Sequence, residues 1–300
     1  MKAADLAELC ALAALWGGSF LFTRIAAPEF GAFALAGLRV IGAMLALLPV
    51  LALRGETRSL AAHWKPILWV GVTNSALPFV CFAYAALTIG AGLSSIFNAA
   101  SPLFGAVIGW LWLNDRLSAS RTLGLVIGFA GVFGLAWSHA GVKDGADALG
   151  TTLAIAACLV GTVSYGYSAN FAKRHLAAAA PIAVATGSQI GAALVLVVPT
   201  VLLWPATPPG VATWIEVALL AVFCTGLAYV MYFRLIAHVG PANAITVTFL
   251  VPVFAVAWGA LFLGETLAAD TLAGCAVILL GTALATGVLQ RQRWLRLQRG

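Results

Sequence analysis

The sequence has very little charge. Only 9% of its 300 residues are Asp, Glu, Lys or Arg, whereas soluble domains are about a quarter charged. Hydrophobic residues make up 62% of the chain, and the mean hydropathy is +1.02. Such a chain must bury its apolar surface in a lipid bilayer. The net charge of +6 does not indicate nucleic-acid binding, because the basic residues fall at the ends of apolar runs and in the tail.

Residues able to carry chemistry are missing from the middle of the apolar runs. Each of the five cysteines lies in a different run, without metal-ligand or redox spacing. Ser19 follows two glycines, but no histidine lies at membrane depth to activate it. We therefore predict no catalytic residue, no metal and no cofactor. Without a mid-span Asp or Glu, a carboxylate proton relay has no carrier, so we expect facilitated diffusion or weak, indirect coupling.

Long continuous apolar runs fill the chain instead. A membrane-spanning helix needs roughly 20 apolar residues, and these runs are too long and continuous for the strands of a barrel. We predict an all-α integral membrane protein with ten transmembrane helices. The predicted spans are 6–26, 32–53, 66–88, 91–113, 119–137, 150–172, 181–204, 214–236, 241–263 and 270–289.

The basic residues are distributed unequally between the two sides of these spans. Thirteen Lys and Arg residues fall on one side, and only Arg24 and Lys143 fall on the other. The excess of basic residues marks the cytoplasmic side, so both termini should be cytoplasmic. The N-terminal run, with one lysine and full spanning length, is read as an uncleaved first span.

One segment of the sequence occurs twice. Residues 90–131 match residues 240–281 without gaps at a shift of 150, with Pro102 opposite Pro252. The match extends to the other spans at a shift of 149 or 150. It divides the chain into a first five-helix repeat, 1–141, a second, 142–289, and a basic cytoplasmic tail, 290–300. Because five is odd, the second repeat should be inverted across the membrane.

Inverted repeats have a mechanical use in transporters, where two equivalent packings open alternately to the two sides and substrate binds between them. Alternatively, the duplication only stabilises a helical bundle. A scaffold or receptor would leave the inverted duplication without a use. We favour a transporter that works by alternating access.

The end of each repeated segment carries a short motif, Leu113-Asn114-Asp115-Arg116-Leu117 in the first copy and Leu263-Gly264-Glu265-Thr266-Leu267 in the second. With the five-plus-five duplication, this motif resembles the drug/metabolite transporter superfamily and its EamA-type ten-helix family, most closely the YddG-like bacterial amino-acid and metabolite exporters. The first copy departs from the family's Leu-Gly-Glu-x-Leu pattern at Asn114 and Asp115. The resemblance implies a bacterial cytoplasmic (inner) membrane carrier with a central cavity lined by helices 1, 3, 4, 6, 8 and 9.

Amides, hydroxyls and aromatic rings recur on faces of those six spans, since residues three and four apart share a helix face. They suit a small zwitterion with a sizeable side chain, because rings cover apolar parts and attract an ammonium group. For any single residue, ordinary packing or an interhelical hydrogen bond is an alternative. The predicted cavity-lining residues are Trp16, Ser19, Phe20, Asn74, Pro78, Phe79, Phe82, Ser94, Asn98, Tyr165, Ser168, Tyr229 and Thr248.

Three further residues are candidates by type. Pro102 and Pro252 remove backbone donors mid-helix and could form paired hinges, although membrane helices also tolerate proline without a gating role. Arg39 is a formal charge inside a span, where an ionisable residue is a functional-site hypothesis by default. It could pair with a substrate carboxylate or phosphate, or instead reach the interface or helix-end carbonyls. Its repeat counterpart, Gln189, is neutral and favours the structural role.

The predicted function is export of small metabolites, most directly amino acids, by a carrier that acts as a monomer in the lipid bilayer. Purine derivatives, sugars and drugs are alternative substrates, because relatives with the same fold handle them. An intramembrane enzyme is the least supported alternative.

Overall fold

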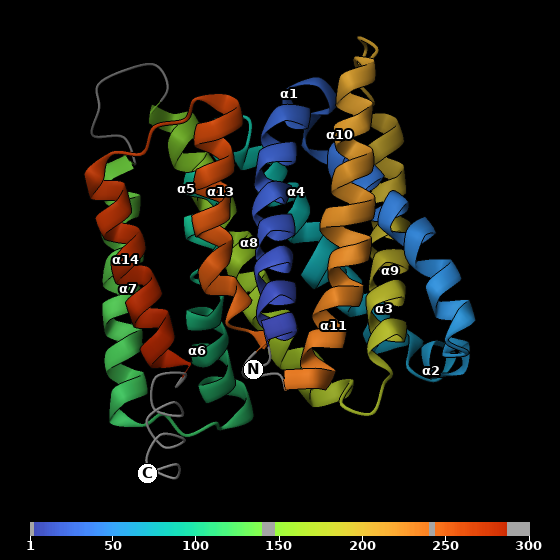
Figure 1. Cartoon of the computed structure of the whole chain (residues 1–300), viewed down its shortest axis with the longest axis horizontal. Helices are drawn as coiled ribbons and strands as arrows, with labels where there is room; N and C mark the ends of the chain where they lie inside the picture. The colour runs from blue at the N-terminus through green and yellow to red at the C-terminus, as the bar shows by residue number, and fades with distance from the viewer. Residues whose placement is uncertain (1–2, 140–147, 240–243, 287–300) are drawn as a thin grey trace.

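The computed structural model describes residues 3–139, 148–239 and 244–286, and in these residues helices are the only regular secondary structure (Figure 1). The predicted all-α membrane fold is confirmed. Seven of the described helices are long and apolar enough to cross a membrane, and two shorter apolar helices follow them. Lys2, Lys143 and the basic tail lie outside the described residues.

The first two predicted spans form one helical run, α1 (Ala3–Leu53), which turns at Gly31. Gly31 has φ 71° and ψ 168°, a conformation that residues with a Cβ rarely adopt. Glu29 lies at this turn and accepts hydrogen bonds from the backbone N of Gly210 at 2.7 Å and from Thr213 Oγ1 at 2.6 Å. These contacts fix the turn to the start of α10 (Val211–Ala221).

Two π-helical segments interrupt the third and eighth predicted spans at matching positions. The third span consists of α3 (Trp64–Gly71), η1 (Val72–Ala76) and α4 (Leu77–Ala85). The eighth consists of α10, η2 (Val222–Leu227) and α11 (Ala228–Val239). The starts of η1 and η2 are 150 residues apart, which is the shift of the sequence repeat. π turns of this kind are frequent at functional sites.

The repeated segment itself folds less uniformly. Its first copy breaks into α5 (Ala91–Asn98) and α6 (Ser101–Leu113), whereas its second copy forms α13 (Val247–Leu263). Helices α6 and α13 end alike, with Asn114 and Gly264 in the left-handed conformation at φ 56° and 64°. Asparagine tolerates this conformation better than most residues, which explains why it can replace the motif's glycine.

The remaining helices are the short α2 (Thr57–Ala62), which was not predicted, and α7 (Ala119–His139), α8 (Ala148–His175), α9 (Pro181–Leu202) and α14 (Ala269–Ala285). Helices α7 and α14 pack along each other at one side of the molecule, and α1 lies centrally against α9, α10 and α13 (Figure 1). Small residues allow the closest approaches: a Cβ on Gly166 of α8 would lie 2.7 Å from the backbone N of Gly105 in α6.

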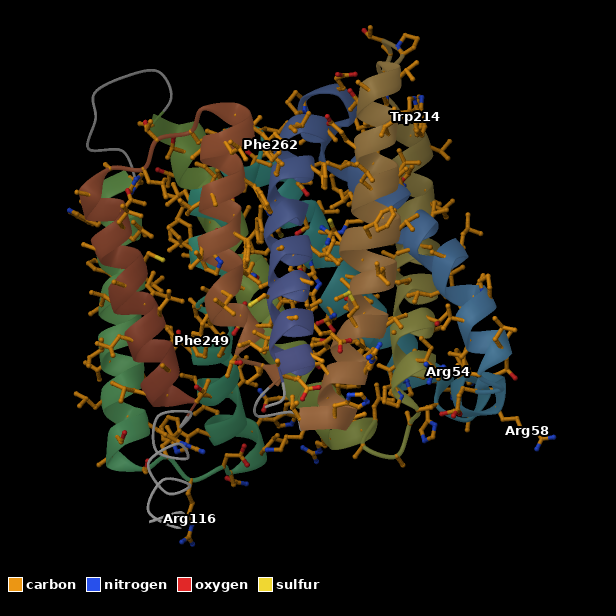
Figure 2. The ribbon with its side chains drawn as sticks, viewed as in Figure 1. Arg54, Arg58, Arg116, Trp214, Phe249 and Phe262 are labelled. Carbon is orange, nitrogen blue, oxygen red and sulfur yellow. The ribbon has the colours of Figure 1, made fainter. Side chains whose placement is uncertain are left out.

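The two ends of the molecule differ in charge. Arg54, Arg58 and Arg116 lie at one end, and Trp214 and Phe262 lie at the other (Figure 2). Arg116 follows the end of α6, and Phe262 is near the end of α13. The corresponding ends of the two repeated segments therefore lie at opposite ends of the molecule.

Candidate functional site

Two hydrogen bonds with equivalent partners join the halves of the chain near the π segments. Arg39 Nε donates to Thr225 Oγ1 at 3.0 Å, and Gln189 Nε2 donates to Ser75 Oγ at 3.0 Å. Shifting Arg39 and Ser75 by 150 residues gives Gln189 and Thr225. Each half thus donates from a helix (α1 or α9) to a hydroxyl in the other half's π segment.

The Arg39 side chain is held by its hydrogen bond to Thr225 and by packing on an aromatic ring. Its Cζ lies 3.7 Å from the ring centroid of Phe79, a cation–π contact. In the described part of the chain, Arg39 has no Asp or Glu partner and its two Nη groups make no hydrogen bond. Insertion scales put the cost of an Arg at the centre of a membrane helix at about 3 kcal/mol, so a guanidinium inside a span is expected to have groups around it that offset its charge.

The hydroxyl of Thr225 takes part in two hydrogen bonds. It accepts from Arg39 and donates to the carbonyl oxygen of Leu220, five residues earlier, at 3.0 Å. Without this side chain the Leu220 carbonyl, loosened by the π turn, would lose a partner. The π segment therefore orients the acceptor that positions the guanidinium.

Other polar groups surround this pair. Asn74 Nδ2 lies 3.4 Å from the hydroxyl oxygen of Tyr229, in hydrogen-bonding range. The hydroxyl groups of Tyr229 and Tyr165 both lie near enough to Arg39 to interact with its charge. We refer to the group drawn from α1, η1, α9, η2 and α11 as the central polar cluster. Its members are Arg39, Asn74, Ser75, Gln189, Thr225 and Tyr229.

Aromatic side chains adjoin the central polar cluster. Phe82 stacks on Tyr165 with centroids 6.1 Å apart, and Phe20 meets Phe82 edge-on at 5.7 Å. The ring of Trp16 contacts the ring of Tyr232, a residue of α11, with centroids 5.2 Å apart. The structure thus brings together aromatic residues from predicted spans 1, 3, 6 and 8.

Five predicted polar residues form only local hydrogen bonds or none among the described residues. Ser19 and Thr248 donate to backbone carbonyls of their own segments, and Asn98 is contacted by Ser101 at the break between α5 and α6. Ser94 and Ser168 are buried, and neither hydroxyl has a hydrogen-bond partner among the described residues. Among the described residues, no hydrogen bond or ring contact joins these five to the central polar cluster.

The two prolines occupy different settings. Pro102 follows the break at residues 99–100 and is the second residue of α6, a position where its missing N–H is not needed. Pro252 lies inside the continuous helix α13, and the turn at residues 245–246 comes before that helix. Pro78 is buried near the start of α4. The paired hinge therefore stays a prediction.

Sequence reasoning missed Ser75 and Thr225, and it gave Gln189 no role of its own. The 150-residue shift that aligned Arg39 with Gln189 also aligns Ser75 with Thr225, so the pairing was accessible in the sequence. The π segments carried no comparable signal.

A model of the EamA-like transporter family matches the chain twice, over residues 6–137 and 152–287. The chain belongs to the EamA-like transporter family. It is a multi-pass membrane transporter. The family, and the transporter names of similar proteins, point away from an enzyme. The predicted resemblance to the EamA-type family is confirmed.

Proteins with transporter names are similar to this one over nearly the whole chain. The uncharacterized transporter YvbV of Bacillus subtilis (strain 168) is 27% identical, covering 95% of this chain and 92% of YvbV. The uncharacterized inner membrane transporter YedA of Escherichia coli (strain K12) is 24% identical, covering 93% of this chain and 89% of YedA. A solved crystal structure superposes with a TM-score of 0.66 at 19% identity, covering 97% of this chain and 99% of the other.

Proposed function

We propose that this EamA-family transporter exports amino acids across the bacterial cytoplasmic membrane, with the substrate carboxylate bound by Arg39. The observation that carries this proposal is the guanidinium itself. It lies inside a predicted span with no acidic partner among the described residues, and its two Nη groups are unused. Two parallel N–H donors match the geometry of a carboxylate.

The surroundings of Arg39 support a zwitterion with a sizeable side chain. Asn74 and Tyr229 offer an amide and a hydroxyl beside the guanidinium, and Phe82 and Tyr165 offer aromatic faces. Aromatic rings attract an ammonium group and cover apolar side chains. We propose the predicted cavity-lining residues as the lining of this site.

The proposed mechanism is alternating access between two inverted five-helix repeats. Its support is the 150-residue relation between the two π segments, the equivalent hydrogen bonds of Arg39 and Gln189, and the opposite placement of the α6 and α13 ends (Figure 2). Arg54, Arg58 and Arg116 share one end, which we assign to the cytoplasm with both termini. We propose that a monomer is the functional unit.

The test is counterflow of labelled L-amino acids into proteoliposomes containing the purified protein. We expect accumulation of large neutral amino acids, and at least a tenfold loss of rate in Arg39→Gln with an unchanged elution profile in detergent. Phenethylamine, which lacks the carboxylate, should not exchange with phenylalanine. Equal transport of phenylalanine by wild type and Arg39→Gln would contradict the role of Arg39.

The same assay covers other substrates. Purine derivatives, sugars and drugs are the alternatives, and exchange of any of these without exchange of amino acids would replace the proposed substrate class. Strongly cationic solutes are disfavoured because Arg39 would repel them.

A further inference from the structure

Each repeat contains one acid and one base at equivalent positions near a membrane surface. Asp115 corresponds to Glu265 at a shift of 150, and Lys173 corresponds to Arg24 at a shift of 149. If the halves behaved identically, Asp115–Lys173 and Glu265–Arg24 would both be ion pairs. The structure contains only the first of these two pairs.

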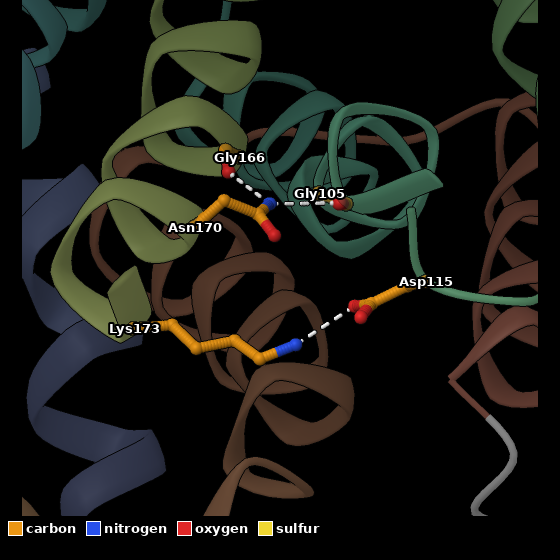
Figure 3. Close-up of polar contacts among 5 residues, drawn as sticks. All are labelled: Gly105, Asp115, Gly166, Asn170 and Lys173. Carbon is orange, nitrogen blue, oxygen red and sulfur yellow. Dashed lines mark hydrogen bonds and ion pairs between the residues drawn. The ribbon is translucent and has the colours of Figure 1, made fainter. Parts of the chain in front are cut away.

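The formed pair joins α8 to the turn after α6. Lys173 Nζ lies 2.8 Å from Asp115 Oδ2 (Figure 3). One helical turn away, Asn170 Nδ2 donates to the carbonyl oxygens of Gly105 at 2.8 Å and Gly166 at 2.9 Å (Figure 3). This end of α8 is therefore held against α6 by an ion pair and an amide.

At the equivalent positions in the other repeat, the acid and the base bind backbone instead of each other. Glu265 accepts from the backbone N of Ala91 at 2.9 Å and of Gly92 at 3.3 Å, at the start of α5. Arg24 Nη1 donates to the carbonyl oxygen of Ala86. Both charges thus hold the connection between α4 and α5, one near each end.

The site of Glu265 is shaped for a carboxylate. A Cβ on Gly90 would lie 2.7 Å from Glu265 Oε2, and a Cβ on Gly259 would lie 2.6 Å from the same atom. A carboxylate at a helix N-terminus also interacts favourably with the helix dipole. In this conformation the backbone N–H groups at the start of α5, and not Arg24, bind Glu265.

We propose that the two pairs form alternately during transport: Asp115–Lys173 closes one end in the conformation seen here, and Arg24–Glu265 closes the opposite end in the other conformation. When Asp115 and Lys173 separate, Glu265 leaves the start of α5 and pairs with Arg24, which leaves Ala86. The connection 86–91 is then released. This inference rests on the proposed alternating access, and it adds the groups that set the balance between the two states.

The exchange is suited to reversibility because neither arrangement is strong. The Lys173 and Asp115 side chains are 60% and 45% exposed, and such pairs contribute little stability. A carboxylate at a helix N-terminus contributes a similarly small amount. Breaking one pair should therefore change the ratio of the two states by up to about fivefold, and not lock the protein.

The experiment measures distances at both ends by double electron–electron resonance in lipid nanodiscs. Spin labels on p-acetylphenylalanine leave the five native cysteines unchanged. One label pair, at Ala119 and Ala177, reports on the Asp115–Lys173 end, and a second, at Pro28 and Thr266, reports on the Arg24–Glu265 end. All four labelled positions are exposed.

In wild type we expect a short distance to dominate for the 119/177 pair. Lys173→Gln should increase the long-distance population of that pair and, in the same protein, the short-distance population of the 28/266 pair. The charge exchange Asp115→Lys with Lys173→Asp should restore both distributions. Adding Arg24→Gln to Lys173→Gln should abolish the response at 28/266 alone.

A change at 119/177 with no change at 28/266 would overturn the inference, as would no change at either pair or a 28/266 response that persists without Arg24. These distances are measured without substrate, so they are independent of the flux assay. Absence of amino-acid counterflow would contradict the proposed function and leave the distance result standing.

Discussion

Arg39 in α1 donates its Nε hydrogen to the hydroxyl of Thr225, which belongs to the other half of the chain, at 3.0 Å. The bond ties the one unpaired guanidinium of the central polar cluster to η2, so the position of the charge depends on the π turn. A change in that turn during transport would therefore move the group that we propose holds the substrate.

The hydroxyl of Thr225 can be tested separately from its methyl group. Thr225→Val keeps the side-chain volume but removes the acceptor of Arg39 Nε and one hydrogen bond to the Leu220 carbonyl, so we expect a fivefold or larger loss of counterflow rate. Thr225→Ser keeps the hydroxyl and should retain most of the rate. Equal losses in both variants would show that packing matters here and not the hydrogen bond.

The equivalent bond in the other half gives a matched comparison. Ser75→Ala removes one of the two acceptors of Gln189 Nε2 and leaves Ser188 Oγ at 3.3 Å. Because Gln189 is neutral, we expect the lost hydrogen bond to lower stability by about 1 kcal/mol while Km for the substrate changes little. Thermal unfolding and counterflow on the same preparation check this. A larger transport defect in Ser75→Ala than in Thr225→Val would place the substrate nearer Gln189 than Arg39.

The contact between α6 and α8 predicts a size limit at Gly166. Because an added Cβ would lie 2.7 Å from the Gly105 backbone N, Gly166→Ala should cost about 1–3 kcal/mol of stability. Gly134→Ala is the control, since no atom lies within 4 Å of its added Cβ. The two variants are compared by thermal unfolding in detergent, and similar melting temperatures would contradict the close packing.

The stability of the folded protein should depend on pH through the carboxyl group of Glu29. Its hydrogen bonds from Thr213 and then Gly210 lower the pKa of this carboxyl below its ordinary value of 4.5. The folded form therefore gains stability from ionised Glu29 above that value, and the gain is lost as the pH falls through the lowered pKa. The melting temperature of wild type should exceed that of Glu29→Gln near neutral pH, and the difference should shrink toward about pH 3. A difference that does not vary with pH would contradict the assignment.

Coupling to protons gives a further prediction. With no acid in the central polar cluster, an imposed pH gradient should change the amino-acid flux by less than about twofold, since a carboxylate relay is the usual carrier. Proteoliposomes loaded at one pH and diluted into another measure this directly. Uptake that follows the gradient in size and direction would require a titrating group that we have not identified.

Much of the fold was predictable because long apolar runs indicate membrane-spanning helices. Glycines and prolines at a constant shift of 150 residues indicate the repeat. The turn between the first two spans was placed correctly around Gly31. The positions of the breaks inside spans were not predictable. Pro102 follows a break in the first copy, whereas the equivalent Pro252 lies inside α13. Neighbouring helices decide these details, and a single sequence does not show them.

The candidate site was predictable in type but not in pairing. Arg39, Asn74 and Tyr229 could be chosen because polar groups in apolar runs must find partners in the protein interior. Which partner each finds depends on helix rotation, and the π turns change that rotation. For Ser94 and Ser168 the sequence reasoning gave a place in the proposed lining, and the structure leaves their hydroxyls buried and unpaired.

The π segments also set which side chains can act on the same substrate. At 3.6 residues per turn, Asn74 and Phe79 would point about 140° apart around a regular helix, toward different neighbours. With η1 between them, Asn74 reaches Tyr229 while Phe79 covers the guanidinium of Arg39. The wider π turn thus changes the direction in which the following side chains point. A polar and an aromatic residue that would face different neighbours on a regular helix therefore both contact residues between the two halves of the chain.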